Sequence, residues 1–270
     1  MGGGPVSYQR CCRGDFQRVC RRADCRFRRL LRKPDVNRRE WNLHADEFES
    51  DICDITVDET DNQLSRYVKA VKPSSDSVLV DLGCGLGSFI QKFGDRFHER
   101  VGIDFASRII ARAKERCAGR LNVTWHVMDI ARASDVIRAR ADLTVCFNVI
   151  TSPSPVKRNA LWSCVKEVTK PHGFALVVVP SIESNSMVEK REGGGGRNGR
   201  RSPPGDGLVK REDSWQKHFS RRELMSIMSQ RGFQVKRIGR AYYPWSTEGL
   251  RKPRSDNQRP WDWICLAQRA

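Results

Sequence analysis

The segment that most constrains the fold covers residues 78–89 and reads VLVDLGCGLGSF. An apolar, β-branched run ends at Asp81, glycines then occupy alternate positions, and an apolar stretch typical of a helix starts at Phe89. A strand, a glycine-rich turn and a helix in this order predict a cradle for a nucleotide. Glycine lets backbone amides approach a ligand, and the helix N-terminus adds free N–H donors and partial positive charge.

Beyond Val78 the chain alternates between apolar runs and amphipathic segments, which is typical of an α/β fold. Strands are expected at 78–82, 100–103, 123–127, 143–147, 174–179, 233–238 and 263–267. Helices are expected at 86–95, 107–117, 133–139, 156–169 and 221–231. Ser107 is the expected N-cap of the second helix. Pro171 and Gly173 are expected to end the fourth helix. Ser220 and Glu223 are expected to form a capping box at the start of the last helix.

Three regions are expected along the chain. Residues 1–34 hold ten Lys or Arg against two Asp and read as a basic flexible tail or a transit peptide. Residues 35–75 are expected to form a helical cap, and residues 76–270 the α/β domain, with a flexible, Gly- and Arg-rich insertion at 184–213. A transit peptide would place the protein in a mitochondrion or plastid, and its absence would place it in the cytoplasm.

Charge and cysteine content narrow the classes of protein further. The net charge of +17 favours phosphates, acidic surfaces or anionic lipid without specifying a fold. The longest apolar run, 174–179, is too short to span a bilayer. The ten cysteines lack the paired spacings of zinc sites, so we expect reduced thiols and no structural metal. The oligomeric state is left open.

Polar residues stand at the ends of four successive predicted strands: Asp81, Asp104, Asp129 and Asn148. In an open α/β sheet, ligands bind outside the carboxyl ends of the strands, so we expect these side chains to converge. Asp104 could accept both hydroxyls of a ribose in charge-assisted hydrogen bonds. Phe105 could pack on the face of an adenine ring.

Residues 80–87, VDLGCGLG, resemble motif I of the class I S-adenosylmethionine-dependent methyltransferases. The resemblance covers residues 76–180 with specific motifs and 214–268 by pattern only. It implies a three-layer, Rossmann-like fold with a seven-stranded mixed sheet in the order 3-2-1-4-5-7-6, strand 7 being antiparallel, and S-adenosyl-L-methionine as the cofactor. The implied cofactor-binding residues are Asp81, Gly83, Cys84, Gly85, Gly87, Asp104, Phe105, Asp129, Ile130 and Asn148.

The resemblance also implies individual roles. The Asp129 carboxylate would meet the adenine amino group and the Ile130 amide a ring nitrogen, although Asp129 also suits a turn that starts a helix. Residues 142–150 resemble motif IV and place Asn148 near the methionine moiety and the transferred methyl. Trp41 and Phe48 resemble an aromatic pair of the N-terminal cap, with ordinary core packing as the alternative.

Methyl transfer from a sulfonium is an in-line displacement, which an enzyme assists mainly by positioning the reactants. A general base is required only when the acceptor must lose a proton, and His218, Tyr242 and Tyr243 are the candidates. The sequence assigns none of them, so the catalytic residues stay unknown. Residues 148–151 lack the Asn-Pro-Pro-Tyr of DNA and protein-glutamine N-methyltransferases, which disfavours exocyclic amines of bases or amides.

We expect a small-molecule acceptor that meets the loops at 184–219 and 241–260. Basic side chains in the second loop would favour an anionic substrate: Arg251, Lys252, Arg254 and Arg259. The alternatives are a protein or RNA methyltransferase, or a cofactor-binding assembly factor without turnover. No RNA-binding module is recognisable, which disfavours nucleic acid, and the G-x-G-x-G spacing disfavours a nicotinamide dehydrogenase.

Overall fold

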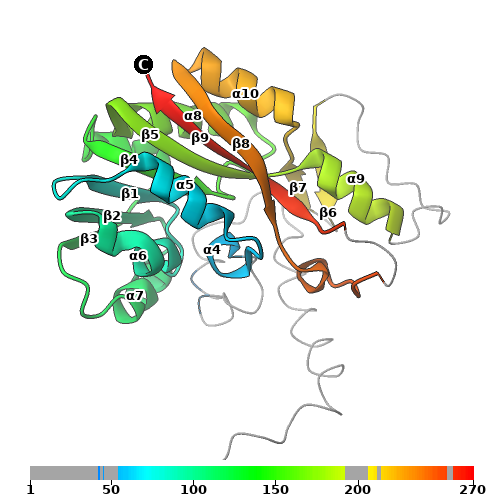
Figure 1. Ribbon diagram of the computed structural model, residues 1–270, viewed down its shortest axis with the longest axis horizontal. Coiled ribbons are helices and arrows are strands. Elements are labelled where there is room, and N and C mark those ends of the chain that lie inside the picture. The colour runs from blue at the N-terminus through cyan, green and yellow to red at the C-terminus, as the bar shows by residue number, and fades with distance from the viewer. Residues whose placement is uncertain (1–41, 43–44, 46–53, 192–205, 212–213, 254–257) are drawn as a thin grey trace, which may run out of the picture.

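The structure, a computed structural model, describes residues 42, 45, 54–191, 206–211, 214–253 and 258–270 (Figure 1). Its centre is a seven-stranded sheet in the order β3-β2-β1-β4-β5-β9-β8. The strands are β1 (Val78–Leu82), β2 (Glu99–Asp104), β3 (Val123–Val127), β4 (Ala141–Phe147), β5 (Thr169–Pro180), β8 (Phe233–Tyr242) and β9 (Trp261–Arg269). Neighbours from β3 to β5 are parallel, whereas β9 is antiparallel to both β5 and β8. The expected strand order and the antiparallel last strand are confirmed.

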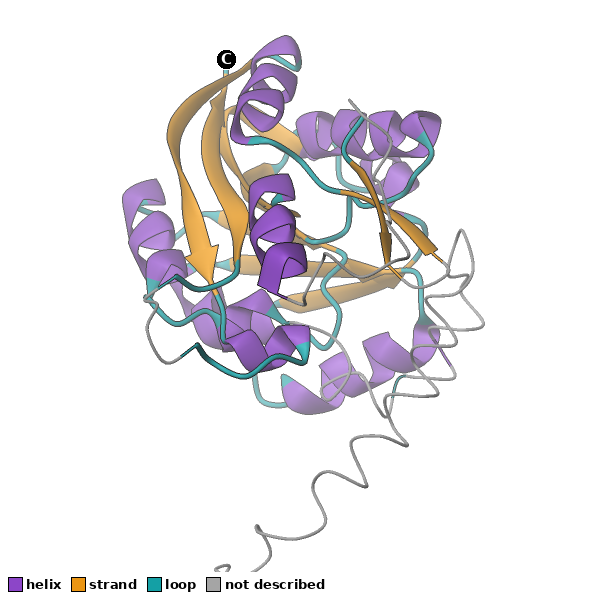
Figure 2. Ribbon diagram, turned by 90° about the vertical axis from the view of Figure 1, so that its right-hand side faces the viewer, coloured by secondary structure: helices purple, strands orange, loops and turns teal. Residues whose placement is uncertain are grey.

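Helices cover both faces of this sheet (Figures 1 and 2). One face packs against α4 (Ile55–Asp58), α5 (Gln63–Val71) and α6 (Ser88–Phe93), and α7 (Ser107–Arg116) lies beside α6. The other face packs against α8 (Pro155–Val168), α10 (Arg221–Gln230) and the 3-10 helix η2 (Ile130–Asp135). The result is the three-layer architecture that the sequence predicted.

Strand alternation explains why both faces are apolar. Side chains at successive positions of a strand point to opposite faces. In β1, Leu79 joins the core beneath α4 to α6, whereas Val80 and Leu82 join the core beneath α8 and α10. The same alternation places Asp81 on the side of α4 to α6, at the end of the strand where the glycine loop begins.

Several local expectations need correction. Ala106, not Ser107, is the N-cap of α7. The helix expected at 133–139 is the 3-10 helix η2, which begins at Ile130 because the Asp129 side chain caps it. α8 ends at Val168, and β5 starts directly at Thr169, so Pro171 and Gly173 lie within a strand.

The insertion expected at 184–213 is too wide. Residues 184–191 belong to α9 (Ile182–Arg191), and a hairpin follows, formed by β6 (Leu208–Arg211) and β7 (Ser214–Lys217). An ion pair between the buried Lys217 Nζ and the partly exposed Glu223 Oε1 (2.7 Å) ties this hairpin to the first turn of α10. The backbone N–H of Glu223 donates to Ser220 Oγ (3.1 Å), as the capping box predicts, but its carboxylate binds Lys217.

Other expectations fall partly or wholly outside the described residues. These include the tail at 1–34, Trp41, Phe48 and most of the helical cap before Asp54. Among the described residues, no helix has the length and apolar character needed to cross a membrane. The described cysteines are buried thiols without a disulfide: Cys84, Cys117, Cys146, Cys164 and Cys265.

Candidate cofactor and transfer site

The glycine loop after β1 is held against the end of β2 by its own backbone. The N–H groups of Gly83 and Cys84 both donate to Ile103 O, at 2.8 and 3.0 Å. Gly83, Gly85 and Gly87 all have positive φ, at 76°, 50° and 74°, a conformation that glycine adopts without steric cost. A Cβ at Gly83 would also clash with the Val149 side chain. The loop therefore needs glycine for its conformation and for the close approach of the segment after β4.

Asp104 joins the end of β2 to this loop. Its carboxylate accepts hydrogen bonds from the backbone N–H of Gly85 (3.3 Å) and of Ala106 (3.0 Å), and the residue is only 7% exposed. Burial raises the pKa of Asp104 to about 6, although the backbone N–H groups of Ala106, Gly85 and Phe105 oppose that rise. Each carboxylate oxygen has more than one acceptor position, so Asp104 can also bind a ligand. The predicted proximity of Asp104 to the glycine loop is correct.

Asp81 adds a second buried carboxyl group, near the end of the neighbouring strand β1. The residue is 4% exposed, and burial raises its pKa to about 8, with the nearby charges of Asp54 and Asp104 acting in the same direction. The glycine-loop thiol, Cys84, is also buried, and burial raises its pKa well above the usual value. Neighbouring acidic groups make a site that favours a positively charged ligand.

The segment after β3 reaches the same loop. Met128 N–H donates to Asp104 O (3.0 Å), and the Ile130 side chain lies 3.3 Å from the position of a Cβ on Gly83. Asp129 is exposed, and its Oδ1 accepts from Ala131 N–H (2.9 Å) as the cap of η2. Ile130 thus lies at the site, and Asp129 has the turn-capping role that was its alternative. Its proposed contact with adenine stays a prediction.

Asn148 stands where β4 leaves the sheet, in a left-handed conformation with φ 54°. Its backbone N–H donates to Val178 O (2.9 Å), and its side-chain Nδ2 donates to Asp262 Oδ2 (2.8 Å). The Asn148 Oδ1 atom is buried, and no residue that the structure describes forms a hydrogen bond with it. A buried polar atom of this kind is rare in folded proteins and points to a missing ligand.

Sequence reasoning missed Asp262. It is the second residue of the antiparallel strand β9 and pairs with Pro180 at the end of β5. The signal was present in residues 260–264, PWDWI, where an acid interrupts an aromatic run that is otherwise strand-forming. Because β9 runs in the opposite direction to β5, its beginning lies at the edge where the parallel strands end.

The described parts of the two loops expected to meet the acceptor lie at this edge too. Lys217 N–H, at the end of the β6–β7 hairpin, donates to Thr151 O (2.8 Å) in the segment after β4. Trp261 N–H donates to Ser184 Oγ (2.9 Å) of α9, and Trp263 Nε1 donates to Glu183 Oε2 (3.0 Å). Figure 1 shows α9 and the hairpin beyond the end of β5.

The three candidate bases are engaged in contacts of their own. His218 is buried, with Nδ1 3.4 Å from Ser181 O, and Tyr243 donates its hydroxyl to Glu248 Oε1 (2.8 Å). The Tyr242 ring packs against Trp261, with 6.3 Å between the ring centroids. These contacts give each side chain a structural role, and general-base function stays a prediction.

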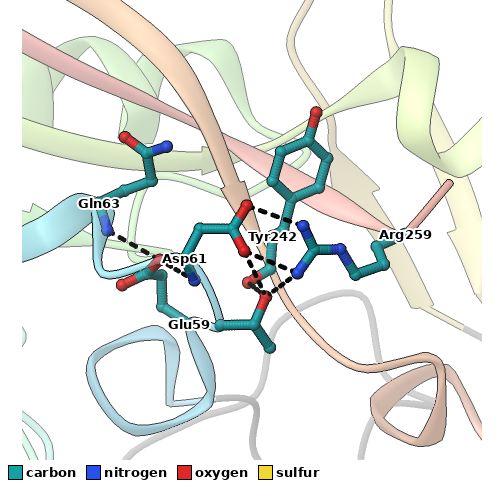
Figure 3. A network of polar contacts seen from close by, with 6 residues as sticks. Glu59, Asp61, Gln63, Tyr242 and Arg259 are labelled. Atoms are coloured by element: carbon teal, nitrogen blue, oxygen red, sulfur yellow. Dashed lines mark hydrogen bonds and ion pairs between the residues drawn. The ribbon is translucent and has the colours of Figure 1, made fainter. Parts of the chain in front are cut away.

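Figure 3 shows how the segment before α5 is fastened to the end of β8. Arg259 donates to both carboxylate oxygens of Asp61, at 2.7 and 2.8 Å, and its guanidinium lies 4.8 Å from the centre of the Tyr242 ring. Thr60 N–H donates to Tyr242 O (3.0 Å). The hydrogen bond from Arg259 lowers the pKa of Asp61. Arg259 is therefore already paired with a carboxylate, which removes it from the basic residues expected to bind an anionic substrate.

These residues fit S-adenosylmethionine by their chemistry. Asp104 offers a carboxylate to ribose hydroxyls, the carboxyl groups of Asp81 and Asp54 favour a cation, and the Asn148 carbonyl oxygen needs a donor. The glycine loop presents bare backbone between them. Gly85 and Asp104 are directly bonded, and Ile130 and Val149 meet at Gly83, so segments after four parallel strands converge as expected.

Known proteins resemble this chain in sequence and in fold. A family model described as a methyltransferase domain matches residues 79–173, whereas no curated protein matches the chain. A S-adenosylmethionine-dependent methyltransferase structure from Methanosarcina mazei is 18% identical, with a TM-score of 0.57 over 75% of this chain and 96% of that one.

Two further solved structures carry S-adenosylhomocysteine. Magnesium protoporphyrin IX methyltransferase from Synechocystis is 16% identical, with a TM-score of 0.51 over 92% of this chain and 94% of that one. An N-methyltransferase from Bradyrhizobium japonicum is 14% identical, with a TM-score of 0.54 over 83% of this chain and 97% of that one. At these identities the likeness shows the fold alone, and the methyltransferase family model matches about a third of the chain, residues 79–173.

Proposed function

We propose that this S-adenosylmethionine-dependent methyltransferase methylates a small-molecule acceptor. The observation that carries the proposal is the cover over the transfer edge, where α9 and the β6–β7 hairpin are tied down by hydrogen bonds. The hairpin bonds to Thr151, α9 bonds to Trp261, and Ser181 pairs with Phe219 as an isolated bridge. An edge closed from several sides suits a compact substrate better than a folded protein or an RNA helix.

The residues of this chain would bind, orient and exclude water. When bound, S-adenosylmethionine supplies an activated methyl group, so that the acceptor's lone pair forms a bond to carbon as the carbon–sulfur pair leaves to sulfur. Asp104 and the glycine loop would hold the adenosyl part, and Asp81 and Asn148 would lie towards the reacting end. Positioning of two reactants contributes about 7–11 kcal/mol in favourable cases, and water exclusion adds to it.

We further propose that the small-molecule acceptor is anionic. Arg251 and Lys252 are exposed beside η3 (Trp245–Glu248), whereas Arg259 is paired with Asp61. The support for an anionic substrate therefore rests on fewer cations than the sequence suggested. The structural neighbour from Synechocystis, named for magnesium protoporphyrin IX, supports a small-molecule acceptor in general rather than any particular charge.

The proposal is tested in two steps. Calorimetry should first show binding of S-adenosylmethionine and S-adenosylhomocysteine. The protein is then incubated with the cofactor and with either the low-mass filtrate or the retained macromolecules of a cell extract, and S-adenosylhomocysteine is measured. We expect product with the filtrate, and much less from an Asp104→Ala control at the same cofactor concentration. Product only with the macromolecular fraction would favour a protein or RNA acceptor, and binding without product in either fraction would favour the assembly-factor alternative.

A further inference from the structure

The pair formed by Asn148 and Asp262 is the feature of the transfer edge that the cofactor alone does not explain. The two residues are 114 positions apart in sequence, and the sheet brings them to a hydrogen bond of 2.8 Å. Asp262 is 5% exposed, so this carboxylate is held away from water beside the end of β4. A buried carboxylate at this point needs a structural or functional reason.

The carboxylate fixes which way the Asn148 side chain faces. A carboxylate only accepts hydrogen bonds, so it attracts the NH₂ group of a carboxamide and repels its carbonyl oxygen. The Asn148 amide is thus oriented with Nδ2 towards Asp262 and Oδ1 on the opposite side. The backbone adds to this constraint, since φ is 54° and the backbone N–H is bonded to Val178 O.

The Oδ1 atom of Asn148, on the side away from Asp262, is an unsatisfied hydrogen-bond acceptor. Within the described part of the chain, nothing donates a hydrogen bond to Asn148 Oδ1, which is buried. The next residue, Val149, contacts the glycine loop at Gly83, which sets Asn148 beside the segment expected to hold the cofactor. A ligand that completes the site at Oδ1 must bring a hydrogen-bond donor.

We propose that Asp262 is a positioning residue that aims Asn148 Oδ1 at the nucleophile, and that the acceptor is therefore an amine or hydroxyl whose proton-bearing atom is methylated. Carboxylates and thiolates bring no such donor and would leave Oδ1 unsatisfied. The hydrogen bond aligns the nucleophile's lone pair, and the proton leaves to water after the new bond to carbon has formed. This inference rests on the proposed function, because it assumes that the transferred methyl lies beside Asn148.

The test does not require the acceptor to be known. Sinefungin carries an amino group where S-adenosylmethionine carries its methyl sulfonium, so it places a donor at the transfer position. Both molecules are cations, and S-adenosylmethionine lacks the donor there, so the ratio of their dissociation constants separates a hydrogen bond from simple charge attraction. We expect the full-length protein to bind sinefungin at least tenfold more tightly than S-adenosylmethionine in calorimetry.

Variants then identify the residues responsible. Asn148→Ala and Asp262→Ala should each abolish the preference for sinefungin while S-adenosylhomocysteine affinity stays within about threefold. Asp262→Asn can still accept from Asn148 Nδ2 and should retain part of the preference, which a loss of packing alone would not restore selectively. Asp142→Asn is the matched control, since this carboxylate lies at the other end of β4, where it accepts from Val78 N–H.

Each remaining outcome overturns the inference in a recognisable way. Equal affinity for sinefungin and S-adenosylmethionine, or a preference unchanged in both alanine variants, would remove the donor-acceptor contact while leaving the proposed function intact. A parallel loss of all three ligands in Asn148→Ala would assign Oδ1 to the cofactor's own amino group. Failure of the unmodified protein to bind any of the three would refute the proposed function itself.

Discussion

Replacement of Asp81 by Asn should stabilise the folded protein while weakening its affinity for the cofactor. Asn has nearly the same shape as Asp but carries no titrating proton. Burial raises the pKa of Asp81 to about 8 from an ordinary 3.8, since the ionised form is disfavoured at a position only 4% exposed. The unfolded chain has the ordinary pKa, so this group's contribution to stability is fully present below pH 3.8 and declines as pH rises towards 8.

The magnitude follows from that interval. Each pKa unit corresponds to about 1.4 kcal/mol, so the loss accumulated by pH 7 is on the order of 4 kcal/mol. The Asn variant escapes this loss. The difference in unfolding free energy between variant and parent should therefore widen by about 1.4 kcal/mol per pH unit between pH 5 and pH 7, and should stop widening above about pH 8.

Denaturant titrations at pH 5, 6, 7 and 8 measure this difference directly. Asp104→Asn provides the matched control, because burial raises the pKa of Asp104 only to about 6, and its widening should end near that pH. Parallel pH profiles for Asp81→Asn and the parent protein would refute the reasoning, as would a variant less stable at pH 7. A gain in stability with a loss of cofactor affinity would mark Asp81 as a residue retained for binding at a cost to folding.

Three further outcomes are expected. Asp104→Ala should weaken cofactor binding more than tenfold in calorimetry, through loss of charged hydrogen bonds of about 1.5–3 kcal/mol. The cofactor affinity of the parent protein should also fall as pH drops below about 6, where Asp104 becomes protonated. Unchanged affinity in both tests would exclude Asp104 from the site. Gly83→Ala should lower the midpoint of thermal unfolding more than Gly119→Ala, because both glycines have positive φ but only at Gly83 would the new Cβ meet a neighbour, and equal losses would contradict this packing argument. A double-mutant cycle on Arg259 and Asp61 should give a coupling energy of about 1 kcal/mol, because the pair is partly exposed. The stabilisation by this pair should be present above the ordinary aspartate pKa of 3.8 and disappear as pH falls through the lowered pKa of folded Asp61. A coupling energy that does not change with pH would contradict the ion pair.

Segments whose structure is decided locally could be predicted from the sequence. The strand–glycine loop–helix unit beginning at Val78 needs no distant partner to be recognised, because glycine positions and apolar runs specify the backbone directly. The Ser220 cap of α10 is equally local, and its hydrogen bond to Glu223 N–H is present at 3.1 Å. The polar residues at the ends of the parallel strands followed from the general geometry of open α/β sheets.

Segments whose structure depends on contacts with distant parts of the chain could not be predicted from the sequence. Strand β6 has only four residues, too few to show a sequence pattern of its own, and its hairpin is secured by the ion pair between Lys217 and Glu223. Arg259 looked like a cation open to an anionic ligand, yet its partner Asp61 lies 198 residues away. Charge in a loop is therefore a poor guide to substrate charge until the partner of each cation is known.

The two halves of the site differ in how the chain encodes them, and the direction of β9 is the reason. The cofactor half comes from parallel strands, each of which delivers its last residue to the same edge, so a search of strand ends finds Asp81 and Asp104. The acceptor half comes partly from a strand that runs the other way, and it delivers its first residues there instead. Asp262 reaches Asn148 for that reason alone, and the paired tryptophans beside it reach α9 in the same manner. A sequence search that includes the beginnings of antiparallel strands should therefore find acceptor-side residues in this fold that the usual reading of strand ends omits.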